Sequence, residues 1–151
     1  MQMNRQTDYA MRAVLYLATS PMARIREIAE AQFVPREYLA KILQKLSKAG
    51  IVNTHRGVDG GISLARAPDQ ISMLDVMEAI EGPITLNRCF IEPGECPRES
   101  YCAVHNELVQ ISSSLSGMFA KVNFARLARK EAALVATGKS RRLQPMADGN
   151  K

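Results

Sequence analysis

The sequence predicts a mainly α-helical fold with one small β-hairpin. Three observations support this class. Apolar residues recur at helical spacing over three short N-terminal segments, a glycine-rich turn separates two β-branched segments, and an apolar heptad pattern follows the cysteines. The chain has 151 residues, 46% of them hydrophobic, which suits one globular domain. The order of these elements is typical of a winged helix-turn-helix with a long C-terminal helix added.

Three short helices are expected in the first fifty residues. The first covers about Asp8–Leu17 and is capped by Thr7-Asp8, and the second covers Ile25–Gln32. The third runs from Pro35 to about Ala49, since proline is tolerated where a helix begins. Gly50 is placed to end this helix in the left-handed conformation.

The third helix is expected to have an apolar face and a basic face. The apolar face consists of Leu39, Ile42, Leu43 and Leu46, and the other face carries Tyr38, Lys41, Lys45 and Lys48. Ile51–Thr54 and Ile62–Leu64 then flank a turn at Asp59-Gly60-Gly61, which predicts a β-hairpin, the wing. His55 and Arg56 lie near its tip.

The sequence pattern as a whole divides the chain into four regions. Residues 1–82 form the winged helix-turn-helix with a further helix, Met73–Glu81, capped by Ser72. Residues 83–101 form an exposed loop, residues 102–136 one long helix, and residues 137–151 a disordered basic tail. The heptad positions of the long helix favour pairing between subunits, and they include Leu108, Ile111, Leu115, Met118 and Val122.

The charge distribution indicates a polyanionic partner. Residues 1–66 carry ten Lys or Arg against five Asp or Glu, and residues 67–104 carry two against seven. Double-stranded DNA fits the basic half, because the third helix would offer its polar face to the major groove. Lys41, Lys45 and Lys48 would contact phosphates, whereas Arg36 and Tyr38 could reach base edges. Arg56, with His55 beside it, could enter the minor groove.

No segment is apolar and long enough for a membrane span or a signal peptide, so we expect a cytoplasmic protein that binds no membrane. No constellation of catalytic residues is visible, and an enzyme is not expected.

All three cysteines, Cys89, Cys96 and Cys102, lie in one acidic stretch, with His105 just after them. Neither paired zinc knuckles nor a C-x-x-C redox motif is present. The odd number argues against a closed disulfide framework. Three readings stay open: an iron–sulfur cluster or metal site, a thiol redox switch, or inert cysteines.

The sequence resembles the iron–sulfur winged-helix transcriptional regulators of the IscR, NsrR and RirA type. The matching segments are "TDYAMRAVLYLA", "IREIAEAQFVPREYLAKILQKLSKAGIV", "RGVDGGISLAR", "ISMLDVMEAIEG" and the three-cysteine loop, over about residues 1–130. The resemblance implies a homodimer that pairs through the long helix and binds a palindromic operator. It also implies that Cys89, Cys96 and Cys102 are cluster ligands.

The resemblance leaves two candidates for the fourth ligand. His105, three residues after Cys102, resembles the histidine that completes a [2Fe–2S] site in IscR-type members. Asp8 resembles the aspartate that reaches across the dimer to a [4Fe–4S] cluster in NsrR-type members. We prefer His105 and a [2Fe–2S] cluster, because this histidine lies beside a thiolate in the same chain.

The sequence therefore predicts a dimeric, cluster-sensing transcriptional regulator, most simply a repressor, responding to iron–sulfur status, nitric oxide, iron or oxidants. The alternatives are a thiol-based redox regulator without a cluster, and a cluster-bearing redox protein.

Overall fold

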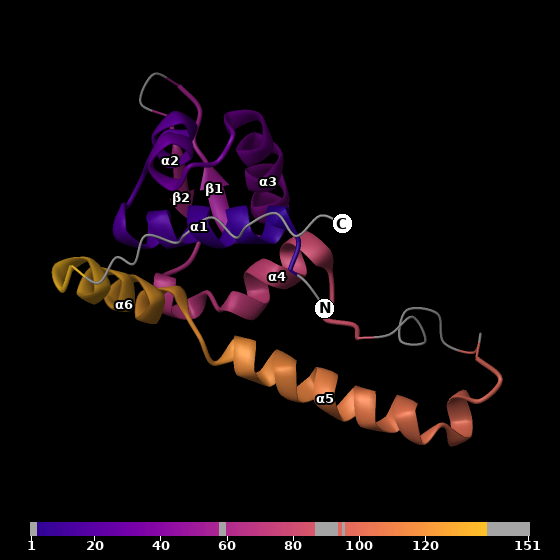
Figure 1. The fold of residues 1–151 in the computed structure, drawn as a ribbon. Coiled ribbons are helices and arrows are strands. Elements are labelled where there is room, and N and C mark those ends of the chain that lie inside the picture. Colours follow the sequence, from indigo (N-terminus) through magenta and orange to yellow (C-terminus); the bar gives the residue numbers. More distant parts are fainter. Residues whose placement is uncertain (1–2, 58–59, 87–93, 95, 139–151) are drawn as a thin grey trace, which may run out of the picture.

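The computed structural model describes residues 3–57, 60–86, 94 and 96–138 (Figure 1). Its helices and strands follow in chain order: α1 (Arg5–Thr19), α2 (Ile25–Gln32), α3 (Arg36–Lys48), β1 (Val52–Thr54), β2 (Ile62–Leu64), η1 (Pro68–Gln70), α4 (Met73–Glu81), η3 (Glu99–Tyr101), α5 (Ala103–Ala120) and α6 (Phe124–Ala136). This order confirms the predicted fold class, a mainly helical chain with one antiparallel hairpin.

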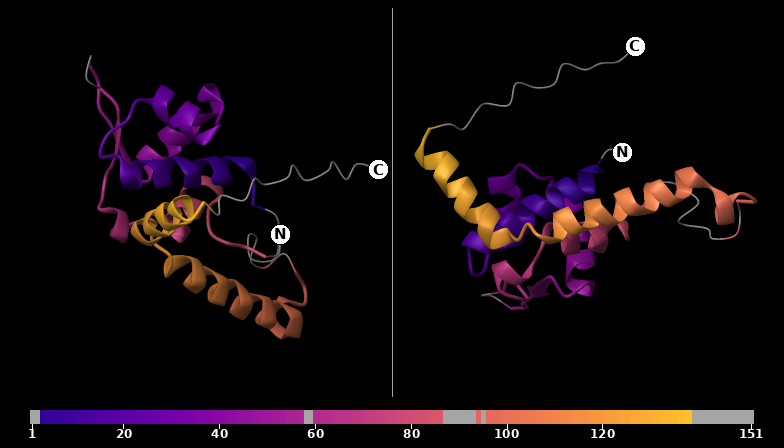
Figure 2. Two further views of the ribbon diagram at one scale, coloured as in Figure 1. Left: turned by 60° about the vertical axis from the view of Figure 1, so that its left-hand side comes forward. Right: turned by 90° about the horizontal axis from the view of Figure 1, so that it is seen from below.

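Helix α1 lies at the centre of the molecule. Helices α2 and α3 and the hairpin cover one side of it, while α4 and α6 lie on the other side (Figures 1 and 2). The core between these elements is apolar, and Phe124 of α6 and Leu39 of α3 are both fully buried in it. Helix α5 extends away from this body toward the cysteine loop (Figure 1).

The first helix starts earlier than expected. Its N-cap is Asn4, whose side-chain oxygen accepts a hydrogen bond from the Thr7 N–H at 2.9 Å. The predicted Thr7-Asp8 cap is therefore wrong: Thr7 is buried in the first turn and Asp8 is an acidic first-turn residue. An acid there is favourable because the N-terminal end of a helix carries partial positive charge.

The predicted long helix from Cys102 to Ala136 is also wrong, because the chain forms two helices, α5 and α6. The backbone at the break bonds to the segment before α4: Met73 N–H donates to Val122 C=O at 2.8 Å, and Phe124 N–H donates to Ile71 C=O at 3.0 Å. Asn123 then caps α6 by accepting a hydrogen bond from the Arg126 N–H. The heptad pattern continues through the break, so periodicity alone could not reveal it.

Other predicted elements are confirmed. Helix α2 has the predicted bounds, and α4 begins with the expected capping box between Ser72 and Asp75. Gly50 follows α3 with φ of 69°, as its expected role requires. Within the described residues, no helix is long and apolar enough to cross a membrane. The tail, predicted to be disordered from residue 137, lies outside the described residues from residue 139 onward.

Candidate nucleic-acid interface and cysteine loop

Helix α3 presents a polar, solvent-facing surface. Its residues Leu39, Ile42, Leu43 and Leu46 are buried against the core, as predicted. The predicted DNA-contacting residues of this helix, Arg36, Tyr38, Lys41, Lys45 and Lys48, are all exposed. The Tyr38 ring is 57% exposed. The Lys45 ammonium donates a hydrogen bond to Gln6 Oε1 of α1 at 3.0 Å, so this lysine is held toward α1.

The wing lies at the same end of the molecule as α2 and α3, away from α5 and α6 (Figure 1). His55 and Arg56 are exposed at its approach to the tip, and the His55 Nε2 lies 2.8 Å from the Ser63 hydroxyl of the opposite strand. An α-helix flanked by a hairpin with exposed cations is the arrangement that winged helices present to a duplex. The predicted tip residues 58–59 lie outside the described residues.

Gly60 and Gly61 of the wing allow backbone segments of the protein to lie close together. A Cβ on Gly60 would collide with the backbone oxygen of His55, and one on Gly61 would approach the Ala23 oxygen to 2.9 Å. Ala23 and Ile62 exchange backbone hydrogen bonds at 3.0 and 2.8 Å, which attach the base of the wing to the segment before α2. The hairpin is thereby held in place as part of the body.

The sequence interpretation missed two polar residues of α3. Glu37 and Gln44 are exposed, and with Lys41 and Lys48 they follow a spacing of four, three and four residues. At 100° per residue, this line lies opposite the buried leucines. The same helical spacing, counted from the centre of the apolar face, could have identified Glu37 and Gln44 from the sequence.

The cysteine loop is ordered by short-range hydrogen bonds where it is described. The Gly94 N–H donates to Glu99 Oε2 at 2.6 Å, and the Glu99 N–H donates to the Cys96 carbonyl at 3.1 Å. Cys102 is the N-cap of α5, and its Sγ accepts a hydrogen bond from the His105 N–H at 3.4 Å. The N-terminal end of a helix stabilises negative charge, which suits a thiolate ligand.

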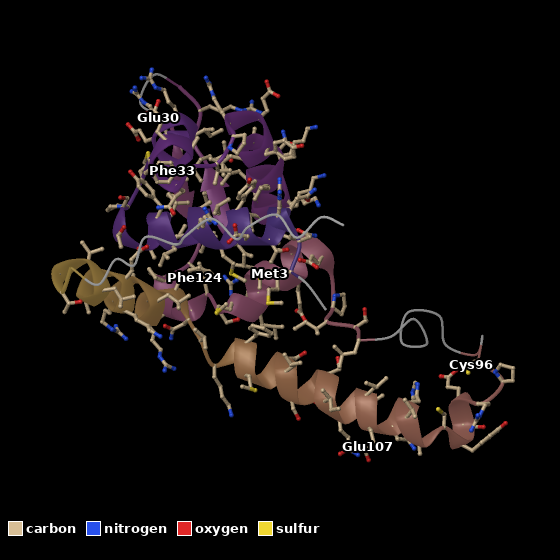
Figure 3. The ribbon with its side chains drawn as sticks, in the orientation of Figure 1. Met3, Glu30, Phe33, Cys96, Glu107 and Phe124 are labelled. Atoms are coloured by element: carbon tan, nitrogen blue, oxygen red, sulfur yellow. The ribbon has the colours of Figure 1, made fainter. Side chains whose placement is uncertain are left out.

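Cys96 and Cys102 are free and partly exposed. Cys96 lies at the far end of the molecule from the core residue Phe124 (Figure 3). Cys89, the remaining predicted ligand, lies outside the described residues. Within the described ranges, no three His, Cys, Asp or Glu side chains come together in a group that could hold a metal ion. The structure thus places Cys102 and His105 in the same first turn of α5. The set of four ligands stays a prediction.

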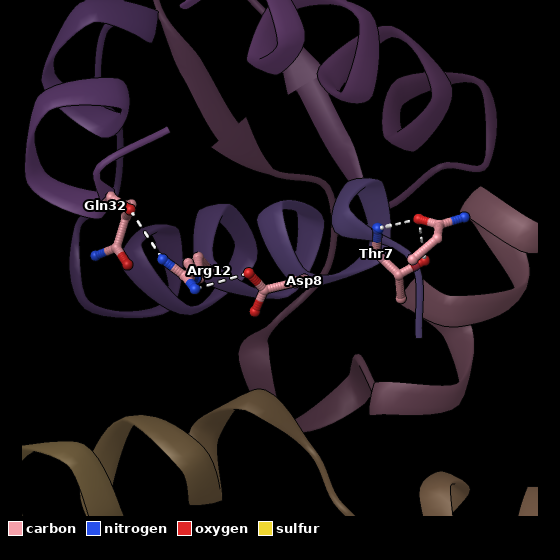
Figure 4. A network of polar contacts seen from close by, with 5 residues as sticks. Thr7, Asp8, Arg12 and Gln32 are labelled. Atoms are coloured by element: carbon pink, nitrogen blue, oxygen red, sulfur yellow. Dashed lines mark hydrogen bonds and ion pairs between the residues drawn. The ribbon is translucent and has the colours of Figure 1, made fainter. Parts of the chain in front are cut away.

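Asp8 lies on α1, where its carboxylate forms an ion pair with Arg12 at 2.7 Å (Figure 4). Arg12 also reaches the Gln32 carbonyl, 3.5 Å away, at the end of α2. The Asp8 side chain is 46% exposed and so is accessible from outside the chain.

Helix α5 exposes much of its apolar surface. Val104, Ile111 and Met118, one heptad apart, are 64%, 49% and 68% exposed, while Leu108 and Leu115 are half-buried. Its one buried residue is Ser112, whose hydroxyl donates to the Ile84 carbonyl at 2.7 Å. Val122, the last predicted dimer residue, lies half-buried between α5 and α6.

The fold resembles solved winged-helix regulators. IscR of T. potens has a TM-score of 0.70 at 22% identity, and the alignment covers 87% of this chain and 88% of that one. CymR of B. subtilis, described as the global cysteine regulator, also has a TM-score of 0.70 at 22% identity, over 86% of this chain and 98% of CymR. At this level of identity, the likeness establishes the fold.

The sequence itself places the chain in a family. It is 32% identical to the HTH-type transcriptional regulator NsrR of Bacillus licheniformis over 112 residues, which are 72% of this chain and 78% of that protein. The profile of the Rrf2 family, described as iron-dependent transcriptional regulators, matches residues 3–130. The relatives are regulators of transcription, so the chain is a DNA-binding protein and no enzyme. The chain belongs to the Rrf2 family of transcriptional regulators.

Proposed function

We propose that this regulator is a homodimer that represses transcription from a palindromic operator, and that an iron–sulfur cluster on its cysteine loop controls its affinity for DNA. The observation that carries the proposal is the position of Cys102. Its sulfur accepts a hydrogen bond from the His105 N–H at the first turn of α5. Helix α5 leads from there back toward the body that contains α3 (Figure 1).

The proposed ligands are the thiolates of Cys89, Cys96 and Cys102, with His105 as the fourth. Thiolates are the usual ligands of such clusters, and a histidine in place of one thiolate also occurs. When bound, the cluster supplies a centre that iron supply, oxidants or nitric oxide can alter. Asp8 of the partner subunit is the alternative fourth ligand, and a [4Fe–4S] cluster then replaces the preferred [2Fe–2S] cluster. Asp8 would then bind iron with the carboxylate that forms an ion pair with Arg12 in the single chain.

Helix α5 supports a dimer in this proposal. Its heptad line of Val104, Ile111 and Met118 lies about a quarter turn from Ser112, the residue that fixes α5 to its own chain. An apolar line of this kind, open to solvent in the single chain, suits pairing with the same helix of a second copy. A symmetric dimer would present two copies of α3, which matches a palindromic site.

Hydrogen bonds hold the segment that leads into the cysteines against α5 and α1. Ile84 at the start of the loop is bonded to Ser112 of α5, and Glu81 at the end of α4 is bonded to Thr7 of α1. Helix α1 in turn packs against both α2 and α3. A change of the loop that favours one arrangement of these helices would shift the population of DNA-competent dimers.

The test begins with anaerobic purification, visible absorption and an assay of iron and sulfide. A duplex selected by the wild-type protein from a random library is then titrated with the coloured and the cluster-free protein. We expect the affinities to differ at least tenfold. The variants Cys89→Ser, Cys96→Ser and Cys102→Ser should each lose the colour, while the exposed Ser113→Ala on α5 should keep it as the matched control.

Two further variants separate the candidate fourth ligands. His105→Ala should change the absorption spectrum and cluster stability, whereas Asp8→Asn should leave both unchanged; the reverse result would favour Asp8 and the [4Fe–4S] alternative. A colourless, iron-free protein whose DNA affinity ignores all three cysteine substitutions would refute the sensor proposal. A colourless protein whose affinity changes with thiol oxidants would instead support the thiol-based regulator.

A further inference from the structure

The most outward edge of α3 is a line of four polar residues. Glu37, Lys41, Gln44 and Lys48 lie opposite the buried Leu39 and Leu46, whereas Tyr38 and Lys45 lie on the flank toward α1. An α-helix that enters the major groove brings its outward edge nearest the bases, and its N-terminal residues reach deepest. Glu37 is in the first turn of α3, so it occupies the position from which a side chain reaches base edges.

The Glu37 carboxylate has no polar partner among the residues that the structure describes. Other charged residues nearby have partners: Glu30 pairs with Arg26 at 2.9 Å, and Lys45 is bonded to Gln6. Within the described part of the chain, the Glu37 side chain makes no hydrogen bond or ion pair, even with Lys41 one turn away. Its carboxylate is therefore available to a ligand on the face that the helix presents.

A carboxylate in this place has a narrow choice of partners on DNA. It repels the phosphates, and it can only accept hydrogen bonds. In the major groove, the amine donors are cytosine N4 and adenine N6, whereas the guanine edge offers only acceptors. The adenine amine lies beside the acceptor N7, which repels a carboxylate, so cytosine is the base that a glutamate suits best. Since the surrounding residues Lys41 and Lys48 are cationic, the lysines would supply affinity and Glu37 would supply discrimination.

We propose that Glu37 is a specificity-determining residue, which reads a cytosine in each half-site by accepting a hydrogen bond from its N4 amine. This inference rests on the proposed operator binding. Glu37 also favours the start of α3 through the helix dipole, but that contribution does not depend on which base lies below it.

The test is selection of binding sites from a random duplex library by the wild-type protein and by Glu37→Ala, Glu37→Gln and Glu131→Gln. Glu131 is exposed on α6, on the opposite side of α1 from α3, so its substitution changes the net charge equally without touching α3. The wild-type and Glu131→Gln proteins should enrich cytosine at one pair of symmetry-related positions. Glu37→Ala should reduce that preference about tenfold and keep the others.

Glu37→Gln adds a readout that a purely structural role would not give. Glutamine pairs well with adenine, so the preferred base at the same positions should change toward adenine. The inference would be overturned if both Glu37 variants kept every base preference of the wild-type protein and changed only the overall affinity. The proposed function would still stand in that case. A wild-type protein that enriches no sequence would instead overturn the proposed operator binding, and this inference with it.

Discussion

The hydroxyl of Thr7, in the first turn of α1, donates a hydrogen bond to the carboxylate of Glu81, in the last turn of α4. Thr7 is fully buried, while Glu81 is exposed and also accepts a hydrogen bond from the Asn4 N–H. The pair joins residues 74 positions apart in sequence, at the point where the chain leaves the DNA-binding half for the cysteine loop. It therefore fixes the N-terminal end of α1 to α4.

Replacing Thr7 by valine removes this hydroxyl at nearly constant volume. Because the acceptor is charged, we expect the free energy of unfolding to fall by about 1–2 kcal/mol. The control is Thr19→Val, whose exposed hydroxyl bonds only to the Tyr16 carbonyl within α1. Urea denaturation of both variants measures the difference. Equal effects of the two substitutions would show that the Thr7–Glu81 bond adds nothing to stability.

Phe33 lies in the left-handed region, with φ of 54°, at the turn between α2 and α3 (Figure 3), and the residue is 87% exposed. Glycine adopts this conformation without steric cost, whereas other residues pay about 1 kcal/mol. Phe33→Gly should therefore raise the free energy of unfolding by about 0.5–1 kcal/mol. Phe33→Ala, which keeps a Cβ, should not, and thermal unfolding distinguishes them. A destabilised glycine variant would mean that the ring packs favourably in this turn.

Lys41 lies on the outward edge of α3, so its substitution should weaken DNA binding at every sequence alike. Each phosphate contact contributes about 0.9 to the slope of log affinity against log salt, and Lys41→Ala should lower that slope by about one unit. Lys130→Ala on α6 is the control, since this exposed lysine lies on the far side of the body. Titrations at several salt concentrations provide the measurement. If Lys41→Ala and Lys130→Ala gave the same slope, α3 would not face the phosphates.

Ile111 is half-exposed on the apolar line of α5, so a charge there should disrupt the proposed subunit pairing without unfolding the chain. We expect Ile111→Glu to weaken the dimer at least tenfold, because a carboxylate in an apolar helix seam would lose its water. Val135→Glu provides the comparison, as this residue of α6 is 68% exposed and lies outside the seam. Analytical sedimentation measures the strength of the dimer in both variants. A dimer that survives Ile111→Glu would place the interface elsewhere.

The local elements could be predicted because their signals are contained in a few neighbouring residues. The buried face of α3, the capping box at Ser72 and the two strands of the wing each follow from spacing and residue type. The break between α5 and α6 could not, since it depends on hydrogen bonds from residues 122–124 to Ile71 and Met73. The same holds for the bond of Lys45 to Gln6, which spans 39 positions and turns the lysine side chain toward α1.

The sequence alone determined which residues are candidates for binding DNA and a cluster: a basic helix and wing in the N-terminal half, and three thiols with His105 in one stretch. These features are local, so periodicity, capping and composition express them directly. The tertiary structure decided how they relate. It bonded Lys45 to Gln6 of α1, buried Thr7 against α4, and left the apolar line of α5 open to solvent. Such relations depend on which distant segments pack together, and that is set by the shared core and by backbone hydrogen bonds across the chain.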